Sequence, residues 1–264
     1  MRGEIDFLHR MKITMIEEAF QLIPGDMLYV DSDTFFIGNP QPVMAEVSTD
    51  VSFMHKLEYP FNLLKEMALP AGIPFRAFYE LISSRDFLLS SGLSLKVLPE
   101  FFSWNAGAMA FHKSHHALLD DVYSLTDQFY PTTQNHASEQ YAFSVVLQIK
   151  TKIKPLEGII YHYWYRVNKT IMDEILNREI GIEFQSMNVE KRANQVLTLT
   201  RQLPHLLESH ILKLRDNAIQ MFHENKFLMG YGFAMRALLK NPTDKNFLLD
   251  LGYHTRRWIK KSFL

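Results

Sequence analysis

The 264-residue sequence contains no cysteine. This absence excludes disulfide bridges and thiolate zinc sites, so any metal must be held by carboxylate, imidazole or carbonyl ligands. Mg²⁺ and Mn²⁺ suit such ligands. The chain also has little net charge, −1 at pH 7, and lacks the broad basic field on which nucleic-acid binding depends. We therefore expect no nucleic-acid partner.

Long apolar runs are missing as well. No window approaches the roughly 20 apolar residues that a membrane-spanning helix needs. The first residues include Arg2, Glu4 and Asp6, which do not fit a signal peptide or an anchor. These features predict a cytoplasmic protein. Residues 256–264 mix Arg and Lys with aromatic and aliphatic side chains, which fits a solvated helix end or a peripheral contact with the inner face of the membrane.

What remains has the composition of a globular protein, with 47% hydrophobic and 22% charged residues. Residues 1–170 alternate between helical, turn and strand patterns, which indicates α/β architecture. Residues 171–264 contain few glycines and long helical periodicities, and we expect a helical C-terminal region there. These helices could bind an acceptor, a membrane or a second copy of the chain in a homo-oligomer.

Periodicity and turn residues predict individual elements in the first region. We expect a helix over residues 4–21 with Leu8, Met11, Met15 and Ala19 on its apolar face, and a buried parallel strand at Met27–Val30. Further strands are expected at 45–53, 108–112 and 158–161, helices at 59–67, from Ser114 through Leu125 and at 139–147, and a loop at 131–135.

The segment that carries chemistry follows the strand at Met27–Val30. Asp31 and Asp33 stand two positions apart at its C-terminal end, where ligands bind in open α/β sheets. With a third ligand, such a pair could hold a divalent cation that neutralises a diphosphate. The alternative is that this Asp-x-Asp only caps a turn and binds no ligand.

This Asp pair and three later segments, in the same order, resemble GT-A glycosyltransferases, particularly family-8-like enzymes. The pair resembles the DxD motif. Residues 102–111, around Asn105-Ala106-Gly107, resemble the Asn-Ala-Gly strand, and Glu139-Gln140 resembles the acidic-Gln element that opens a helix. Residues 159–164 resemble the closing strand, whose histidine here is His162.

The resemblance covers residues 27–169 and implies a GT-A, Rossmann-like nucleotide-diphospho-sugar transferase core. It also implies a UDP- or GDP-sugar donor and a carbohydrate or lipid-linked acceptor. The site residues that it implies are Asp31, Asp33 and His162 for Mn²⁺ or Mg²⁺, Asn105, Ala106, Gly107 and Lys169 for substrate, and Glu139 and Gln140 for catalysis.

The sequence departs from the family in two places. Tyr165 and Asn168 stand where the family has a glycine and a lysine, so Lys169 would have to reach a phosphate from a shifted loop. The family also carries several βαβ units before the DxD strand, whereas here that strand begins at residue 27. We therefore expect the core to lack its first strands, as a fragment or with a partner covering the gap, and to bind the donor weakly.

Other interpretations stay open. Asp31-Ser32-Asp33-Thr34 also resembles the haloacid-dehalogenase phosphatase signature, in which Asp31 would be the nucleophile and Asp33 the general acid/base. A non-catalytic scaffold with a glycosyltransferase fold is a third possibility. Among single residues, His162 could be a hydrogen-bonded core residue, and Glu139 could complement a helix dipole. We expect His112, His115 and His116 to be surface residues.

Overall fold

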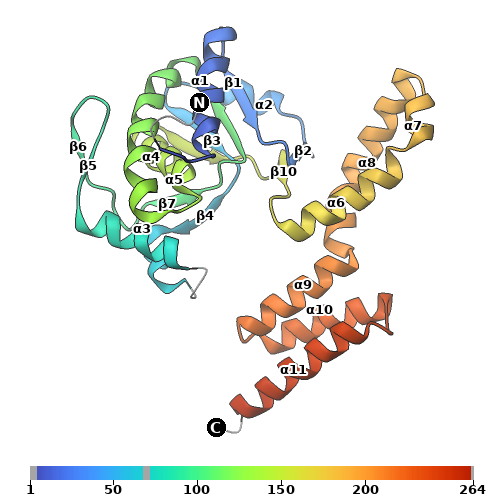
Figure 1. Cartoon of the computed structure of the whole chain (residues 1–264). Helices are drawn as coiled ribbons and strands as arrows, with labels where there is room; N and C mark the ends of the chain where they lie inside the picture. Colours follow the sequence, from blue (N-terminus) through green and yellow to red (C-terminus); the bar gives the residue numbers. More distant parts are fainter. Residues whose placement is uncertain (1–4, 68–71, 263–264) are drawn as a thin grey trace. The chain divides into compact units, whose positions relative to one another are not determined.

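The computed structural model describes residues 5–67 and 72–262. The chain divides into two compact units, Met1–His162 and Tyr163–Leu264 (Figure 1). The first is a mixed α/β unit with small sheets, and the second is helical. This confirms the expected change from α/β to helical architecture along the chain. Helix α6 (Arg166–Glu179) runs through the boundary expected at residue 170.

The first unit contains five α-helices in its described part. They are α1 (Arg10–Leu22), α2 (Gln41–Glu46), α3 (Ile73–Ser84), α4 (Leu119–Thr133) and α5 (Ser138–Lys150). Its short elements are the strands β2 (Thr34–Phe36), β4 (Leu57–Pro60), β5 (Phe87–Leu88), β6 (Ser94–Leu95), β7 (Phe102–Trp104) and β10 (Ile160–His162) and the 3-10 helices η1 (Phe61–Glu66) and η2 (Lys113–Leu118).

The main sheet has four strands in the order β1-β8-β3-β9. Strands β1 (Met27–Val30) and β3 (Val51–Met54) pair antiparallel with β8 (Ala108–Phe111), and β9 (Lys152–Pro155) pairs parallel with β3. The predicted bounds of β1 are confirmed. The expectation of a buried parallel strand is wrong, because β1 ends the sheet in the described part of the chain, is mostly half-buried and has an antiparallel neighbour.

The two faces of this sheet are covered by different helices. Met109 and Phe111 of β8 join a large apolar cluster with side chains from α1, α3, α4 and α5. Ala108 and Ala110 face the other way, into a smaller cluster with Val43 of α2. This alternation follows from the two-residue period of a strand.

Helix α1 begins at Arg10, and the expected start at Glu4 lies outside the described residues. Its predicted apolar face is wrong. Leu8, Met11 and Met15 are exposed, whereas Ile13 and Ile16 are fully buried. Both faces of this helix carry apolar side chains, so periodicity alone could not decide which one packs on the sheet.

Some of the remaining predicted elements are confirmed and others are wrong. The strand at 108–112 and the helices at 139–147 and from residue 114 onward match β8, α5 and η2 with α4, while the strand at 158–161 overlaps β10. The segment predicted as a strand at 45–53 contains the end of α2 and most of β3, and the helix predicted at 59–67 is the end of β4 followed by η1. The loop expected at 131–135 begins later, because α4 continues through Pro131.

The second unit consists of helices in its described part: α6, α7 (Ile182–Ser186), α8 (Val189–Ser209), α9 (Ile211–His223), α10 (Phe227–Lys240) and α11 (Lys245–Ser262). Its core lies around Phe222 of α9, Phe227 of α10 and Phe247 of α11. No helix in the described ranges is long and apolar enough to cross a bilayer.

Candidate metal centre

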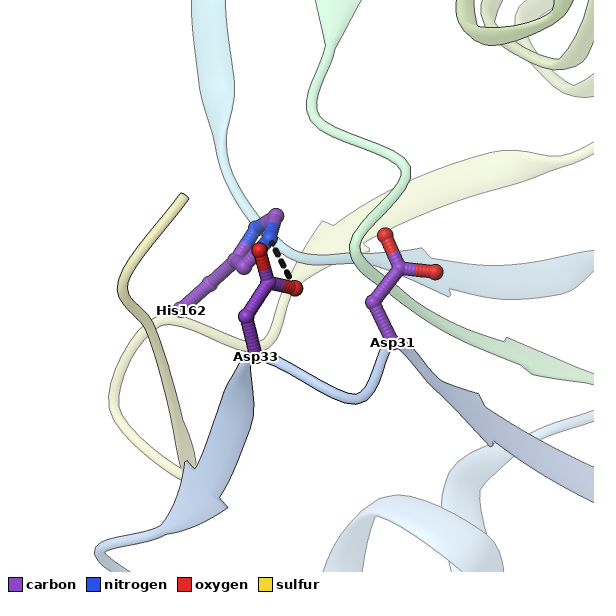
Figure 2. Close-up of side chains that lie close together, drawn as sticks. All are labelled: Asp31, Asp33 and His162. Atoms are coloured by element: carbon purple, nitrogen blue, oxygen red, sulfur yellow. Dashed lines mark hydrogen bonds and ion pairs between the residues drawn. The ribbon is translucent and has the colours of Figure 1, made fainter. Parts of the chain in front are cut away.

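A turn and a strand pairing bring the predicted metal ligands together. Asp31 and Asp33 lie in the turn between β1 and β2, where the Asp31 amide donates to Gly107 O at 2.8 Å and Thr34 Oγ1 donates to Asp31 O at 2.7 Å. Strand β10 pairs with β2 so that His162 is opposite Thr34. The imidazole therefore arrives beside the carboxylate of Asp33 (Figure 2).

The three side chains form a compact group, as Figure 2 shows. One ligand atom from each of Asp31, Asp33 and His162 lies within 4.8 Å of the others, and His162 Nε2 is 3.1 Å from Asp33 Oδ1. Two atoms bound to one cation at about 2.1 Å can be at most about 4.2 Å apart. The group would thus have to close by only several tenths of an ångström to hold a cation.

Hydrogen bonds determine which nitrogen of His162 carries hydrogen. The Gly107 amide can only donate, and it donates to Asn105 Oδ1 at 3.0 Å, so this Asn105 atom is an acceptor. His162 Nδ1 is 2.8 Å from the same oxygen and must be the donor in that bond. In the neutral ring Nε2 then carries the lone pair, as in metal sites where the second nitrogen is fixed by a hydrogen bond.

The charge state of His162 depends on this environment. Burial lowers its pKa, although the nearby carboxylates of Asp33 and Asp31 act in the opposite direction. In the neutral form, the lone pair of Nε2 faces an acceptor oxygen of Asp33 at 3.1 Å. Two acceptors at that distance repel each other unless a proton or a cation lies between them. Two carboxylates and one neutral imidazole fit Mn²⁺ or Mg²⁺.

Gly107 leaves the space that the imidazole occupies. A Cβ at this position would lie 2.0 Å from His162 Cε1 and 2.1 Å from Nδ1. The resemblance implies that this glycine lies at the substrate, and in the structure the group packed against it is the His162 ring. A side chain here is therefore incompatible with the observed position of the ring.

Lys12 is part of the site and was not identified from the sequence. Its Nζ lies 3.1 Å from Asp31 Oδ2, 3.5 Å from Glu139 Oε1 and 3.2 Å from Ala106 O. The helical pattern of α1 places this lysine among polar positions without indicating what it faces. The structure shows that it joins the Asp pair to Glu139.

Tyr29 supports Asp31 from the strand itself. Its hydroxyl donates to Asp31 Oδ1 at 2.5 Å, and burial, followed by the bond to Asp31, raises the pKa of the phenol far above its ordinary value. Tyr29 therefore remains a neutral donor. Asp31 is thus held on one oxygen by a phenol and on the other by an ammonium.

Glu139 lies in the first turn of α5 with only 4% of its surface exposed. Its Oε1 faces Lys12, whereas its Oε2 is buried and has no hydrogen-bond partner among the described residues. Burying an acceptor oxygen without a hydrogen bond costs free energy unless a ligand supplies the donor. The predicted catalytic carboxylate is therefore linked to the predicted metal ligand Asp31 through Lys12, with one acceptor atom unused.

Gln140 and Asn105 belong to a supporting network around Glu58. Gln140 donates to Glu58 Oε2 and Ser103 Oγ, both at 2.9 Å, and accepts from the Ala106 amide at 3.2 Å. Asn105 Nδ2 donates to Glu58 Oε1 at 3.2 Å. In this geometry Gln140 and Asn105 position the Asn-Ala-Gly segment, and both amides are used within the protein. Glu58 was not identified from the sequence.

The last predicted site residue lies in the second unit. Lys169 is an exposed residue of α6, while Asn168 beside it is buried. The structure therefore brings together eight of the nine predicted site residues within the first unit. It does not place Lys169 among them.

Comparisons with known protein families, with curated proteins and with solved structures found no match to this chain.

Proposed function

We propose that the first unit is the core of a metal-dependent glycosyltransferase that takes a nucleotide-diphosphate sugar as donor, as the resemblance to GT-A enzymes implies. One observation carries the proposal. His162 and Asp33, 129 positions apart, face each other at 3.1 Å, with Asp31 beside them. These are the three ligands that the resemblance implies, and they come from segments far apart in the sequence.

Each side chain has a role in this proposal. Asp31, Asp33 and His162 would hold Mn²⁺ or Mg²⁺, which would neutralise the diphosphate as the sugar departs. Glu139 Oε2 would accept a hydrogen bond from the sugar or face the developing positive charge at its anomeric carbon. Asn105 would position His162 through Nδ1, so that the lone pair of Nε2 is on the side of Asp33. Gln140 would position Ala106, whose carbonyl accepts from Lys12.

The test is metal and nucleotide binding by the full chain. Isothermal titration calorimetry should detect Mn²⁺ binding, and Mn²⁺ should strengthen the binding of UDP or GDP. Asp33→Asn should weaken Mn²⁺ binding by about tenfold or more, because it removes a charged ligand. Asp120→Asn, the same change at an exposed position of α4, is the matched control and should bind as the wild type does.

Three outcomes would contradict the proposal. Equal Mn²⁺ binding by Asp33→Asn and wild type would show that Asp33 is not a metal ligand. Hydrolysis of p-nitrophenyl phosphate that is lost in Asp31→Asn would favour the phosphatase interpretation. Mn²⁺ binding with no effect on UDP or GDP would favour a non-catalytic scaffold.

A further inference from the structure

Helix α10 of the second unit is apolar on two opposite faces. Phe227, Gly230, Ala234 and Ala237 are buried against the core of that unit. A helix at a protein surface ordinarily turns polar residues outward, and a helix that is apolar all round is ordinarily covered on every side. The outward face of α10 is therefore unusual for a solvated helix.

That outward face carries a line of residues without charge, which we name the α10 stripe: Leu228, Gly232, Met235 and Leu239. Their spacing of four, three and four residues puts them on one side of the helix. Leu228, Met235 and Leu239 are 81%, 62% and 79% exposed. A patch of this kind marks an interaction surface, because isolated exposed side chains do not align along one helix face.

The charged residues of α10 and of the segment that follows it indicate which kind of partner fits the stripe. Helix α10 contains no Asp or Glu, and its two charged residues, Arg236 and Lys240, are exposed. Residues 226–264 contain eight Lys and Arg and two Asp, a net charge of +6 in a chain whose total is −1. Exposed apolar side chains flanked by cations, without acids between them, complement an anionic lipid surface.

The C-terminal residues contribute differently from what the sequence suggested. Trp258 of that segment stacks on Phe227 and contacts Tyr231, with ring centroids 5.6 and 5.7 Å apart. Trp258 therefore packs α11 against α10. Arg256 and Lys260 of α11 are exposed and add to the positive charge, while Phe263 and Leu264 lie outside the described residues.

We propose that the α10 stripe inserts among the headgroups of an anionic bilayer, with α10 lying in the plane of the interface. Leu228, Met235 and Leu239 supply the apolar contact, and Arg236, Lys240 and the cations of α11 supply the attraction. Neither contribution suffices alone for stable binding, which is why both are needed. This proposal does not depend on the catalytic role of the first unit.

Vesicle flotation of the full chain tests the proposal. The wild type should float with vesicles made of equal parts phosphatidylcholine and phosphatidylglycerol, and not with vesicles of phosphatidylcholine alone. The triple variant Leu228→Gln, Met235→Gln, Leu239→Gln should bind at least about tenfold more weakly, because it removes the inserted apolar groups. The matched control, Met15→Gln, Leu22→Gln, Leu93→Gln, changes exposed residues of the same types in the first unit and should bind as the wild type does.

A single introduced cysteine gives a second readout, because the chain has none of its own. An environment-sensitive dye on Leu239→Cys should shift to shorter emission wavelengths with anionic vesicles, and the same dye on Leu22→Cys should not. Equal flotation of the triple glutamine variant, or of the wild type on neutral vesicles, would overturn the proposal. So would capture by immobilised poly-glutamate without binding to anionic vesicles, which would indicate an acidic protein as the partner.

Discussion

The His162 ring fills the space that a side chain at position 107 would occupy. The glycine amide orients Asn105, Asn105 orients the imidazole, and the missing side chain leaves room for the ring. The geometry of the candidate metal centre therefore depends on a residue that would not itself contact a cation.

Gly107→Ala should disrupt metal binding. The added Cβ would lie 2.0 Å from His162 Cε1, so the ring has to leave its place beside Asp33. We expect Mn²⁺ affinity to fall by about tenfold or more, in line with losses seen when supporting residues of metal sites are changed. Calorimetric titration measures this. Gly25→Ala, where a Cβ meets nothing within 4 Å, is the control and should leave the affinity unchanged.

Lys12 competes with any cation for Asp31 while it holds the site together. Lys12→Met should lower the stability of the metal-free protein by about 1–2 kcal/mol, because Asp31 and Glu139 lose their shared counterion. It should also strengthen Mn²⁺ binding, because the positive charge near the ligands is gone. Thermal melts with and without Mn²⁺ measure both effects. A variant that binds Mn²⁺ more weakly would show that Lys12 supports the site rather than competing for it.

The residues that sequence reasoning missed share one property. Lys12 and Glu58 contact the predicted site residues through tertiary structure, and their own sequence neighbourhoods contain no motif. Asp31, Asp33 and His162 could be proposed because the order of four motifs along the chain carried the information. Contacts between segments far apart in sequence leave no such local mark.

At the scale of elements, η2 is tied to the loop before β3 by a buried histidine. His115, 3% exposed, donates from Nε2 to Thr49 O at 3.0 Å and accepts at Nδ1 from the His112 amide at 3.2 Å. Burial lowers its pKa, although the hydrogen bond to Thr49 O acts in the opposite direction. The expectation that His115 is a surface residue is therefore wrong, because the ring packs under η2 instead of pointing to solvent.

This tie predicts a loss of stability in mild acid. The unfolded chain, with a histidine pKa of about 6.5, takes up a proton before the folded chain does. Stability is therefore complete above that pH and falls as the pH drops through the interval between the unfolded and folded values. Urea unfolding at a series of pH values measures how the free energy of unfolding depends on pH. The slope of this free energy against pH should be smaller in His115→Gln than in wild type. His116→Gln, at an exposed neighbour, should keep the wild-type slope.

Element predictions succeeded where one pattern dominated. Strand β8 alternates Ala with Met and Phe, and α5 is a single uninterrupted helix, so both were predicted close to their bounds. Residues 45–53 and 59–67 contain short elements that switch type within a few residues, and a window wide enough to show periodicity averages across the change. In α1 two apolar faces compete, and only packing on the sheet chooses between them.

At the scale of the whole molecule, each unit has its own buried core, and the predicted ligands all belong to the first. A ligand stabilises the structure that binds it, by about 2.7 kcal/mol at a hundredfold excess over its dissociation constant. Differential scanning calorimetry should therefore show one transition that Mn²⁺ moves upward and another that it moves less. Equal shifts of both transitions would show that the units unfold together.

The near-neutral total charge conceals an uneven distribution along the chain. Residues 1–225 carry a net charge of −7, and residues 226–264, which include the exposed cations of α10 and α11, carry +6. Near its isoelectric point such a chain should be retained at low salt by both anion- and cation-exchange resins, where a protein with evenly mixed charges would pass through. Chromatographic behaviour at neutral pH thus follows from where the cations lie, and the isoelectric point alone would mislead anyone choosing a column.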